Sequence, residues 1–566
     1  MLAIGHRSTF TEGGFNALGS VYAGTSPDSR RDHCRADVPD AILASARHLR
    51  HRDADPSGAP SYSVPSRSLV PVPDVPIGVE VVWFKRDLRS HDHAPLVEAA
   101  ARGPVLPLYV VEPSLWASPD ASARQWRFVS GSLRELGERL ARLGSPLRIV
   151  VGEAVDVFEG LRRGGAFSIW AHEETGNDLS YARDRAVRAW ARARGVPFRE
   201  LPSGGVVRRL ASRDDWDRVF DERLALPLLA PPAALLDPGL ALPTLVPELD
   251  LPFDPAEGQP GGRKAGLALL ASFLEGRGRD YPKALSSPLT AFDACSRLGP
   301  HLALGTLSGR EVLRVLHARI EAEGDPAWRG ACRALATRVR WRDHFVQKLE
   351  SEPAIEHENM VRGFDGMRDP TPDPERLSAW REGRTGFPMV DASMRCLAAT
   401  GWINFRMRAM LQSFASYSLW LHWRGPGLHL ARLFVDYEPG IHWAQAQMQS
   451  GTIGVGAIRV YDPTKQGADH DPRGEFVARW VPELAGLPPV YRLEPRLLTP
   501  ETRRRVGYPL PVVELSDAHA HARARLAEFR ERPEVREEAL AARARHGSRR
   551  PIPPRPRPRP QAGLFG

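Results

Sequence analysis

The segment GWINFRMRAMLQSFASYSLWLHW, residues 401–423, sets the expected fold of the C-terminal half of the chain. Apolar side chains occupy nearly every face of a helix drawn through it, which is typical of a helix buried inside protein. Its first turns nevertheless carry Arg406 and Arg408, whose guanidinium groups stay charged and are costly to remove from water. Two residues span about 200° of helix rotation, so these side chains point to different faces. The segment therefore predicts a buried helix that meets an anion or an acceptor on each of two sides.

Length and composition limit the class of protein. A chain of 566 residues is too long for one ordinary hydrophobic core, so we expect two or three folded units. Hydrophobic residues make up 42% of the chain, and no apolar run is long enough to cross a bilayer. The first residues lack the apolar segment and cleavage site of a secretory signal. We therefore expect a cytoplasmic protein without a membrane span.

Charge and cysteine content narrow the class of partner. The formal net charge of +9 favours contact with a polyanion, although an Arg-rich composition also arises without any binding. Cys34, Cys295, Cys332 and Cys396 show no paired spacing, which argues against a zinc module and against a disulfide framework. An iron–sulfur ligand set is arithmetically open to four cysteines, but Cys34 lies in an aperiodic arm. We therefore predict no metal site.

The sequence changes character along its length. Residues 1–78 mix Ser, Pro, Asp and Arg without periodicity and predict a disordered extension. From 79 to 210, short apolar runs such as VEVVWF and FSIWAHE alternate with amphipathic helical stretches, which indicates an α/β domain with a parallel sheet covered on both faces. A connector rich in Pro and Leu follows over 211–262. Residues 263–490 then predict a helical domain, and residues 491–566 a charged helical stretch that ends in an extended Arg/Pro tail.

Six motifs follow one another through the α/β and helical regions. The first two belong to the α/β region and the other four to the helical region. In this order they resemble the DNA photolyase and cryptochrome family, and the resemblance covers residues 80–490. It implies a Rossmann-like antenna domain with a parallel sheet, followed by an all-helical FAD-binding domain. The motifs are VVWFKRDLRSHDHAPL (81–96), HEETGNDLSYARDRAV (172–187), DACSRLGPHLALGTLS (293–308), RWRDHF (340–345), GRTGFPMVDASMRCLAATGWINFRMR (383–408) and YDPTKQGADHDPRGEFVARWVPEL (461–484).

The resemblance implies a set of FAD contacts. CSRLGPHL, residues 295–302, resembles the family's phosphate loop, although Cys295 and Gly299 stand where Thr and Ser are common. A plain helix cap is the alternative interpretation of that loop. Arg408 resembles an arginine that lies beside the flavin and pairs with an aspartate, here Asp436; a purely structural ion pair is its alternative. The implied cofactor contacts are Tyr281, Cys295, Ser296, Arg297, Leu298, Gly299, Arg342, Arg408, Asp436 and Glu438.

The resemblance also implies a reaction and a substrate. In the family, excited reduced FAD donates an electron to a pyrimidine dimer that is flipped out of UV-damaged DNA. Arg338 stands where repair enzymes place an acidic or amide residue, and Phe405 where Asn is frequent, so the lesion preference stays open between cyclobutane dimers and 6-4 photoproducts. Ordinary core packing is the alternative for the tryptophans. The implied DNA contacts are Arg338, Trp341, Trp402, Asn404 and Arg406.

A chain of tryptophans carries electrons to the flavin in the family. Trp423 resembles its middle member, and Trp443 is a candidate for a place nearer the flavin. His442 is a candidate for the residue that faces the reactive ring edge. Residues 363–374 offer no distal tryptophan, so Trp420 and Trp380 remain loose alternatives. We expect an altered electron path.

Three functions and two smaller sites stay open. Light-driven DNA repair is favoured over a blue-light-sensing cryptochrome and over a nucleic-acid-binding protein that has lost its flavin. A second antenna chromophore, a folate or a deazaflavin, has no diagnostic residue set. QAGLF, Gln561–Phe565, resembles peptides that bind the replication sliding clamp, with an idle terminus as the alternative. We expect a monomer.

Overall fold

The structure is a computed structural model that describes residues 78–253, 258–454 and 458–549. All of them belong to a compact unit that spans residues 54–566. The predicted disordered extension, the Arg/Pro tail and the clamp-binding segment Gln561–Phe565 lie outside the described residues, apart from Gly78. Within the described ranges, no helix combines the length and the apolar character needed to cross a membrane.

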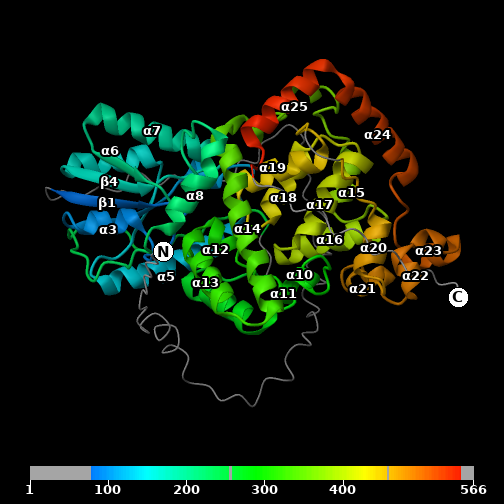
Figure 1. Cartoon of the computed structure of the whole chain (residues 1–566), viewed down its shortest axis with the longest axis horizontal. Coiled ribbons are helices and arrows are strands. Elements are labelled where there is room, and N and C mark those ends of the chain that lie inside the picture. Colours follow the sequence, from blue (N-terminus) through cyan, green and yellow to red (C-terminus); the bar gives the residue numbers. More distant parts are fainter. Residues whose placement is uncertain (1–77, 254–257, 455–457, 550–566) are drawn as a thin grey trace, which may run out of the picture. The chain divides into compact units, whose positions relative to one another are not determined.

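A parallel sheet of five strands forms the N-terminal domain (Figure 1). The strand order is β3-β2-β1-β4-β5. From β1 the chain adds β2 and β3 on one side, and it then crosses to the other side of β1 to add β4 and β5, so the strand order reverses at β1. Glu80 of β1 pairs with Val105 of β2, and Val79 pairs with Phe167 of β4. The strands are β1 (Val79–Phe84), β2 (Val105–Val111), β3 (Arg148–Val151), β4 (Phe167–His172) and β5 (Phe198–Leu201).

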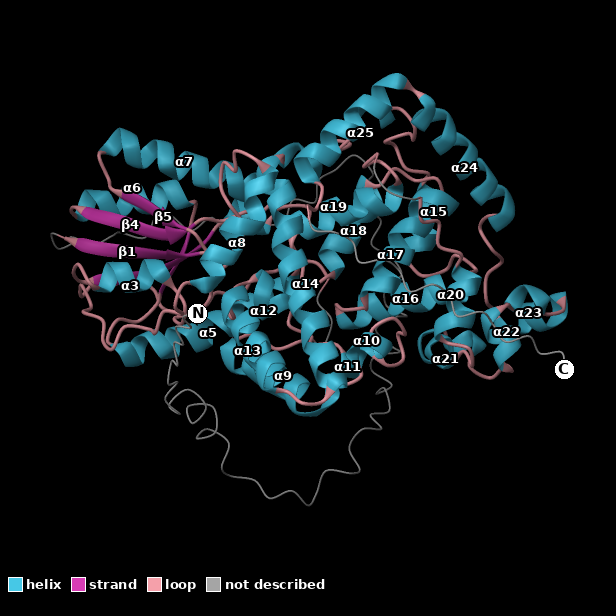
Figure 2. Cartoon of the chain, in the orientation of Figure 1, coloured by secondary structure: helices cyan, strands magenta, loops and turns pink. Residues whose placement is uncertain are grey.

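Helices cover both faces of this sheet, as the sequence pattern predicts (Figure 2). Val82 and Phe84 of β1 pack on one face against Leu96 and Leu133, whereas the alternate residues face a second core that contains Phe158. Both faces of β1 are therefore apolar, which explains its nearly continuous apolar sequence. The covering helices are α3 (Ala94–Ala100), α4 (Pro113–Trp116), α5 (Ala123–Leu143), α6 (Ala154–Gly164) and α7 (Asp178–Arg194).

The connector belongs structurally to the α/β domain. After η2 (Arg213–Asp215) and α8 (Trp216–Ala225), the described residues up to 262 form no further helix or strand. The backbone of this segment bonds to strand residues, because Val105 N–H donates to the carbonyl of Leu236 and Ile149 N–H to that of Pro243. The connector thus runs along the sheet. The division into an α/β domain over 79–210 and a connector over 211–262 stays a prediction.

The remainder of the described chain is helical. α9 (Arg263–Ser272), η3 (Phe273–Arg277), α10 (Tyr281–Ala284), α11 (Ala291–Ala294), α12 (Gly299–Ala303), α13 (Gly309–Ala322) and α14 (Pro326–Ser351) come first. η4 (Pro353–Glu356), η5 (Arg362–Phe364), α15 (Pro374–Arg381), α16 (Pro388–Thr400), α17 (Phe405–Ser413), η6 (Phe414–Ser418), α18 (Arg424–Leu433) and α19 (Pro439–Ser450) follow. The last are α20 (Pro463–His470), α21 (Glu475–Trp480), η7 (Pro482–Leu484), α22 (Pro489–Leu493), η8 (Pro495–Leu497), α23 (Pro500–Val506), α24 (Leu515–Glu531) and α25 (Pro533–His546).

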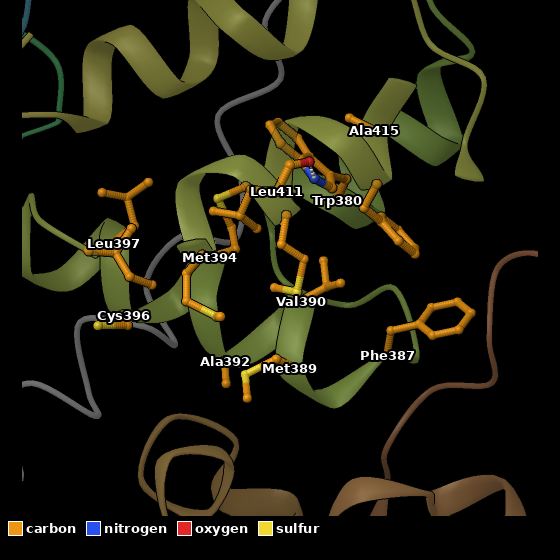
Figure 3. Packing of buried hydrophobic residues seen from close by; sticks show 14 of the residues in the cluster. Trp380, Phe387, Met389, Val390, Ala392, Met394, Cys396, Leu397, Leu411 and Ala415 are labelled. Atoms are coloured by element: carbon orange, nitrogen blue, oxygen red, sulfur yellow. Dashed lines mark hydrogen bonds between the residues drawn. The ribbon is translucent and has the colours of Figure 1, made fainter. Parts of the chain in front are cut away.

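The segment 401–423 is buried but is not one helix, which corrects the expectation. Gly401 adopts a left-handed φ of 71° and ends α16, a conformation that glycine adopts without strain. α17 begins only at Phe405, so Trp402 precedes the helix and does not share a helical stripe with Arg406. Figure 3 shows the core that α16 and α17 build around Trp380, whose Nε1 donates to the carbonyl of Leu411 at 3.2 Å.

Candidate functional site

Arg408 and Asp436, paired by the resemblance, form a bidentate ion pair. Nη1 and Nη2 of Arg408 lie 2.9 and 3.0 Å from the two carboxylate oxygens of Asp436. The third donor, Nε, bonds to the carbonyl of Ile403 at 2.7 Å, and the guanidinium stacks on Phe434. Fork-to-fork geometry of this kind fixes both groups in orientation. α17 therefore delivers one arginine to the loop that precedes α19.

The loop 295–299 lies directly against Asp436. A Cβ added to Gly299 would come within 2.5 Å of Oδ2 of Asp436, so a larger residue does not fit without movement. Arg297 has a left-handed φ of 59°, which is strained for a residue with a side chain. The carbonyls of Cys295 and Ser296 accept from Arg277, so the loop turns these carbonyls toward that guanidinium. Gly299 is required here for its size, whatever the loop binds.

Three guanidinium groups surround this loop, and we call Arg277, Arg297 and Arg408 the arginine cluster. Asp436 pairs with Arg408, whereas Arg277 bonds only to backbone carbonyls and Ser272 in the part of the chain described. Nε of Arg297 is buried and has no hydrogen-bond partner among the described residues. Burial and its cationic neighbours lower the pKa of Arg297 to about 10, which leaves it charged at neutral pH.

This donor set fits a phosphate-bearing cofactor. A buried cation with an unused donor is costly unless an anion meets it. A diphosphate offers several acceptor oxygens at once and is the anion that arginine forks bind well. The cluster and the loop 295–299 could therefore hold the diphosphate of FAD.

Arg342 and Glu438 also meet, but in an ion cluster that links α14, α19 and the end of β1. Nη2 of Arg342 lies 2.7 Å from Oε2 of Glu438, and Arg86 approaches the same oxygen at 3.4 Å. Arg342 bonds in addition to Asp343 at 2.8 Å. Oε1 of Glu438 is buried without a hydrogen-bond partner in the described ranges. One acceptor of this cluster thus remains free for a ligand.

His442 on α19 is a neutral imidazole. Its Nε2 lies 2.7 Å from the carbonyl of Gly427 and must donate, so Nδ1 carries the lone pair. Burial, with Arg408 nearby, lowers the pKa of His442 to about 4. The ring packs between Tyr437 and Trp443. A neutral ring with one free acceptor is what α19 presents at this position.

Trp443 and Trp423 form an edge-to-face pair in the buried core. Their ring centroids lie 5.8 Å apart at 68°, and both rings are almost fully shielded from solvent. The two alternatives are placed differently. Trp420 packs between Arg368 and His521, and Trp380 packs against His429. The pair predicted on sequence grounds is therefore brought into contact by the fold.

The outer face of α14 presents one open aromatic ring. Trp341 is 40% exposed and packs on His344 and Phe345. Arg338, one turn earlier, is exposed and lies over the ring of Phe405 on α17. Burial raises the pKa of Tyr281 to about 12, with Arg338 interacting with its hydroxyl. Arg338 therefore links Tyr281, a predicted cofactor contact, with Phe405, and lies one turn of α14 from the exposed Trp341.

Two predicted DNA contacts are closed in this structure. Trp402 is 7% exposed, with Arg297 stacked 4.2 Å from its ring and Phe292 4.7 Å away. Asn404 is 1% exposed, and its Nδ2 donates to the carbonyls of Leu285 and Ser286. Neither side chain offers a surface to DNA; Asn404 instead ties α17 to the end of α10.

Arg406 remains available, in contrast. Its Nη2 makes a long bond of 3.3 Å to the hydroxyl of Ser286, and Nε has no partner among the described residues. The two arginines of α17 therefore differ in their partners. Arg408 meets Asp436, and Arg406 keeps donors to spare.

A cavity at the carboxyl edge of the sheet was not identified from the sequence. It lies where ligands bind in open parallel sheets, beside the strand at which the order reverses. Arg183 crosses it with ion pairs to Glu112, Glu174 and Asp184, and Lys85 bonds to Asp184 at 2.8 Å. Burial raises the pKa of Glu112. The sequence signal was the charged run Lys85–Asp87 directly after β1, with Glu112 directly after β2. The lining includes Trp83, Lys85, Tyr109, Glu112, Trp116, Asp120, Asn177, Arg183 and Tyr437.

Asp87, His93 and His172 gather in the same domain with spacing that suits a metal ion. Oδ2 of Asp87 accepts from Nε2 of His93 at 2.9 Å and from Nδ1 of His172 at 2.7 Å. Nδ1 of His93 accepts the N–H of Leu96, so the proton of this neutral ring sits on Nε2. A metal would have to displace that proton and the helix cap. The three side chains therefore connect β1, α3 and β4 by hydrogen bonds. The absence of a metal site stays a prediction.

Comparison with known proteins gives the same family for both domains. Residues 80–220 match the family profile described as DNA photolyase, and residues 335–528 match the FAD binding domain of DNA photolyase. A deoxyribodipyrimidine photo-lyase of Streptomyces griseus is 31% identical over 467 residues, which cover 78% of this chain and 98% of that protein. A cryptochrome DASH of Gloeobacter violaceus is 29% identical over 485 residues, covering 78% and 94%.

Solved structures agree with this result. A class III photolyase of Agrobacterium tumefaciens superposes with a TM-score of 0.69 at 25% identity, covering 83% of this chain and all of that one. A photolyase of Sulfolobus tokodaii, solved with two FAD molecules, superposes with a TM-score of 0.63 at 25% identity, covering 80% and 100%. An α/β domain followed by a helical domain is thus the shared architecture.

Proposed function

Because the chain belongs to the DNA photolyase and cryptochrome family, we propose that it binds FAD among its helices and uses light to repair pyrimidine dimers in DNA. The observation that carries the proposal is the arginine cluster beside the loop 295–299. Three half-buried guanidinium groups lie there, and one of them, Arg408, forms an ion pair with a carboxylate, that of Asp436. Such an excess of positive charge is stabilised by a bound anion.

The residues of the chain divide the work. The arginine cluster and the loop bind the diphosphate, and Glu438 and His442 present one free acceptor each on the side of α19. Bound FAD, when reduced and excited by light, supplies the electron that splits the cyclobutane ring. The surrounding helices exclude water from this site.

Trp341 and Arg406 are the proposed DNA contacts. The exposed face of Trp341 suits stacking with a base that has left the duplex. Arg406, which is half-buried and bonds to Ser286 through Nη2 at 3.3 Å, suits a phosphate of the same strand. Arg338 extends this positive surface on the neighbouring turn of α14.

Trp423 and Trp443 are the proposed path by which FAD is reduced. Their rings are in edge contact, and Trp443 also contacts His442. The closed position of Trp402 and Asn404 favours a second candidate function, light sensing without repair, because it removes two of the predicted DNA contacts.

We further propose that the cavity at the sheet edge takes a second chromophore. Its aromatic lining suits a planar ring system, and Glu112 keeps one buried oxygen without a partner among the described residues. The photolyase of Sulfolobus tokodaii holds a second FAD. A folate or a deazaflavin is the alternative to a second FAD in this cavity.

A repair assay separates the candidate functions. Reduced protein is incubated under blue light with an oligonucleotide that carries one cyclobutane dimer or one 6-4 photoproduct, against a dark control. Repair of one substrate in the light supports a photolyase, and the identity of that substrate gives the lesion class. FAD binding without repair of either substrate supports the light sensor.

Matched variants locate the lesion site. Trp341→Ala should lose repair while keeping FAD, because it removes the stacking surface. Trp328→Ala changes a half-buried tryptophan on the same helix, distant in sequence, and should keep both. Equal repair by the two variants would contradict the role of Trp341.

A further inference from the structure

The indole of Trp423 is linked by two hydrogen bonds, through Asn359, to an exposed carboxylate. Nε1 of Trp423 donates to Oδ1 of Asn359 at 2.8 Å, and Nδ2 of Asn359 donates to Oδ1 of Asp365 at 2.7 Å. Asn359 is buried in the segment between η4 and η5, whereas Asp365 is exposed directly after η5. A buried ring therefore communicates through one amide with a charge at the surface.

This chain of bonds stabilises an indole that has lost an electron. Loss of an electron makes the indole N–H strongly acidic, so a hydrogen bond from Nε1 becomes stronger in the oxidised ring. The carboxylate of Asp365 polarises the amide of Asn359 and makes its oxygen a better acceptor. Hydrogen bonds that involve a charged group are roughly twice as strong as neutral ones. Trp423 thus has two groups that favour its oxidised form.

Trp443 has weaker support. Its Nε1 is buried and makes no hydrogen bond of normal length within the described ranges; only the hydroxyl of Tyr437, which donates its own proton to Asp120, lies near it at longer range. An electron hole created on Trp443 therefore gains free energy by moving to Trp423, whose ring lies 5.8 Å away. This difference favours movement of the electron hole from Trp443 to Trp423, away from His442 and α19.

Other charges near Trp423 make Asp365 necessary. His422, packed 5.3 Å from the Trp423 ring, has its pKa lowered by burial and by Arg368 and Arg424, and raised by Asp365. Both arginines oppose a positive charge in this region. Asp365 is the carboxylate that offsets them.

We propose that Asn359 and Asp365 are positioning residues that draw the electron hole from Trp443 to Trp423. The inference rests on the proposed function, since the oxidant is light-excited oxidised FAD. Trp443 loses one electron to FAD, and Trp423 passes one electron to Trp443. The Nε1 proton stays in its bond to Asn359, and without an added thiol reductant the electron returns from FAD to Trp423 and closes the cycle.

The hydrogen bond itself is tested without light or cofactor. We would record ¹⁵N-indole spectra of the apo-protein and identify the Trp423 signal by its loss in Trp423→Phe. Asn359→Leu should shift that signal upfield, and Asp365→Asn should shift it in the same direction by less. Asp369→Asn, a change of another exposed carboxylate on the same loop, should leave it in place. A Trp423 signal unmoved by Asn359→Leu would overturn the inference, whether or not the protein repairs DNA.

The electronic role is tested in the FAD-loaded protein by transient absorption of the tryptophan radical. Asn359→Leu should shorten the lifetime of the separated charge by roughly tenfold, the effect of losing one ordinary to strong hydrogen bond. Asp365→Asn should shorten it by less, and Asp369→Asn should not change it. If the separated charge lives as long in both Asn359→Leu and Asp365→Asn as in the wild type, the proposal is overturned. A protein that takes up no FAD would instead refute the proposed function.

Discussion

The sheet-edge cavity and the arginine cluster treat charge in opposite ways. At the sheet edge, Arg183 alone meets three carboxylates, and Lys85 shares one of them. At the loop 295–299, three arginines gather, and the ion pair there joins Arg408 to Asp436. The first region balances its charges internally. The second is completed by an anion, which is why we assign the essential cofactor to the helices.

The largest expected effect comes from the ion pair of the helical region. Arg408→Ala leaves Asp436 without its counterion, which costs about 3 kcal/mol for a buried pair. We expect a lower melting temperature and loss of FAD from the purified protein, measured as the ratio of flavin to protein absorbance.

Arg183→Ala is the matched change in the α/β domain. It also breaks buried ion pairs, so it should destabilise the protein by a similar amount. Its FAD content should nevertheless stay at the wild-type level. If both variants lost FAD equally, the loss would reflect stability alone and the distinction between the regions would fail.

Gly299→Ala should have the next largest effect. The added Cβ would press on Asp436, turning the carboxylate away from Arg408. We expect weaker FAD binding in a titration of the apo-protein, with the fold retained in circular dichroism. Gly425→Ala, in α18, meets no atom within 4 Å and should bind FAD normally.

Arg406 and Trp341 should differ in how salt affects DNA binding. Arg406→Ala should weaken binding to damaged DNA and reduce the salt slope by about one, because one phosphate contact is lost. Trp341→Ala should weaken binding by about 1–3 kcal/mol of stacking without changing the slope. Binding isotherms at several salt concentrations measure both. An unchanged salt slope in Arg406→Ala would contradict the proposed contact between Arg406 and a DNA phosphate.

The smallest effect concerns the acid stability of α19. His442 has a pKa of about 4 in the folded protein against 6.5 ordinarily, so the unfolded chain binds more protons between these values. The free energy of unfolding should fall as pH is lowered from 6.5 to 4. In His442→Asn that fall should be smaller, as measured by urea denaturation at several pH values, although other buried histidines keep part of it. An identical fall would mean that His442 is accessible.

Much of the fold follows from sequence pattern alone. The runs VEVVWF and FSIWAHE form β1 and β4, because strands buried on both faces leave nearly continuous apolar sequence. The sequence pattern predicts helices at 263–277, 308–322, 328–349 and 388–399, and α9 with η3, α13, α14 and α16 match these ranges within a few residues. Periodicity is reliable where a helix has one clear apolar face.

The segment 401–423 escaped the same reasoning. Its apolar residues surround the helix axis, so periodicity could not show where the helix starts; Gly401 and the N-cap residue Asn404 are the local signals of a break. Trp402 consequently lies outside α17 and under Arg297. The partners of a buried side chain come from distant segments, as Asn404 and Ser286 show. Sequence alone does not place such contacts.

Part of the site was predictable through the resemblance. It paired Arg408 with Asp436 and implied that the loop 295–299 contacts the same cofactor, and the structure brings the loop and the pair together. It left a second chromophore open without indicating which residues line the sheet-edge cavity, and it gave no indication of Asn359. Both depend on which side chains meet across elements, and no short motif encodes that.

The most direct test compares two ligands of the apo-protein. FAD carries the diphosphate that the arginine cluster is proposed to bind, and riboflavin has the same ring system without it. We predict that FAD binds at least about tenfold more tightly and that only its affinity falls as salt is raised. Equal affinities with no effect of salt would contradict the account.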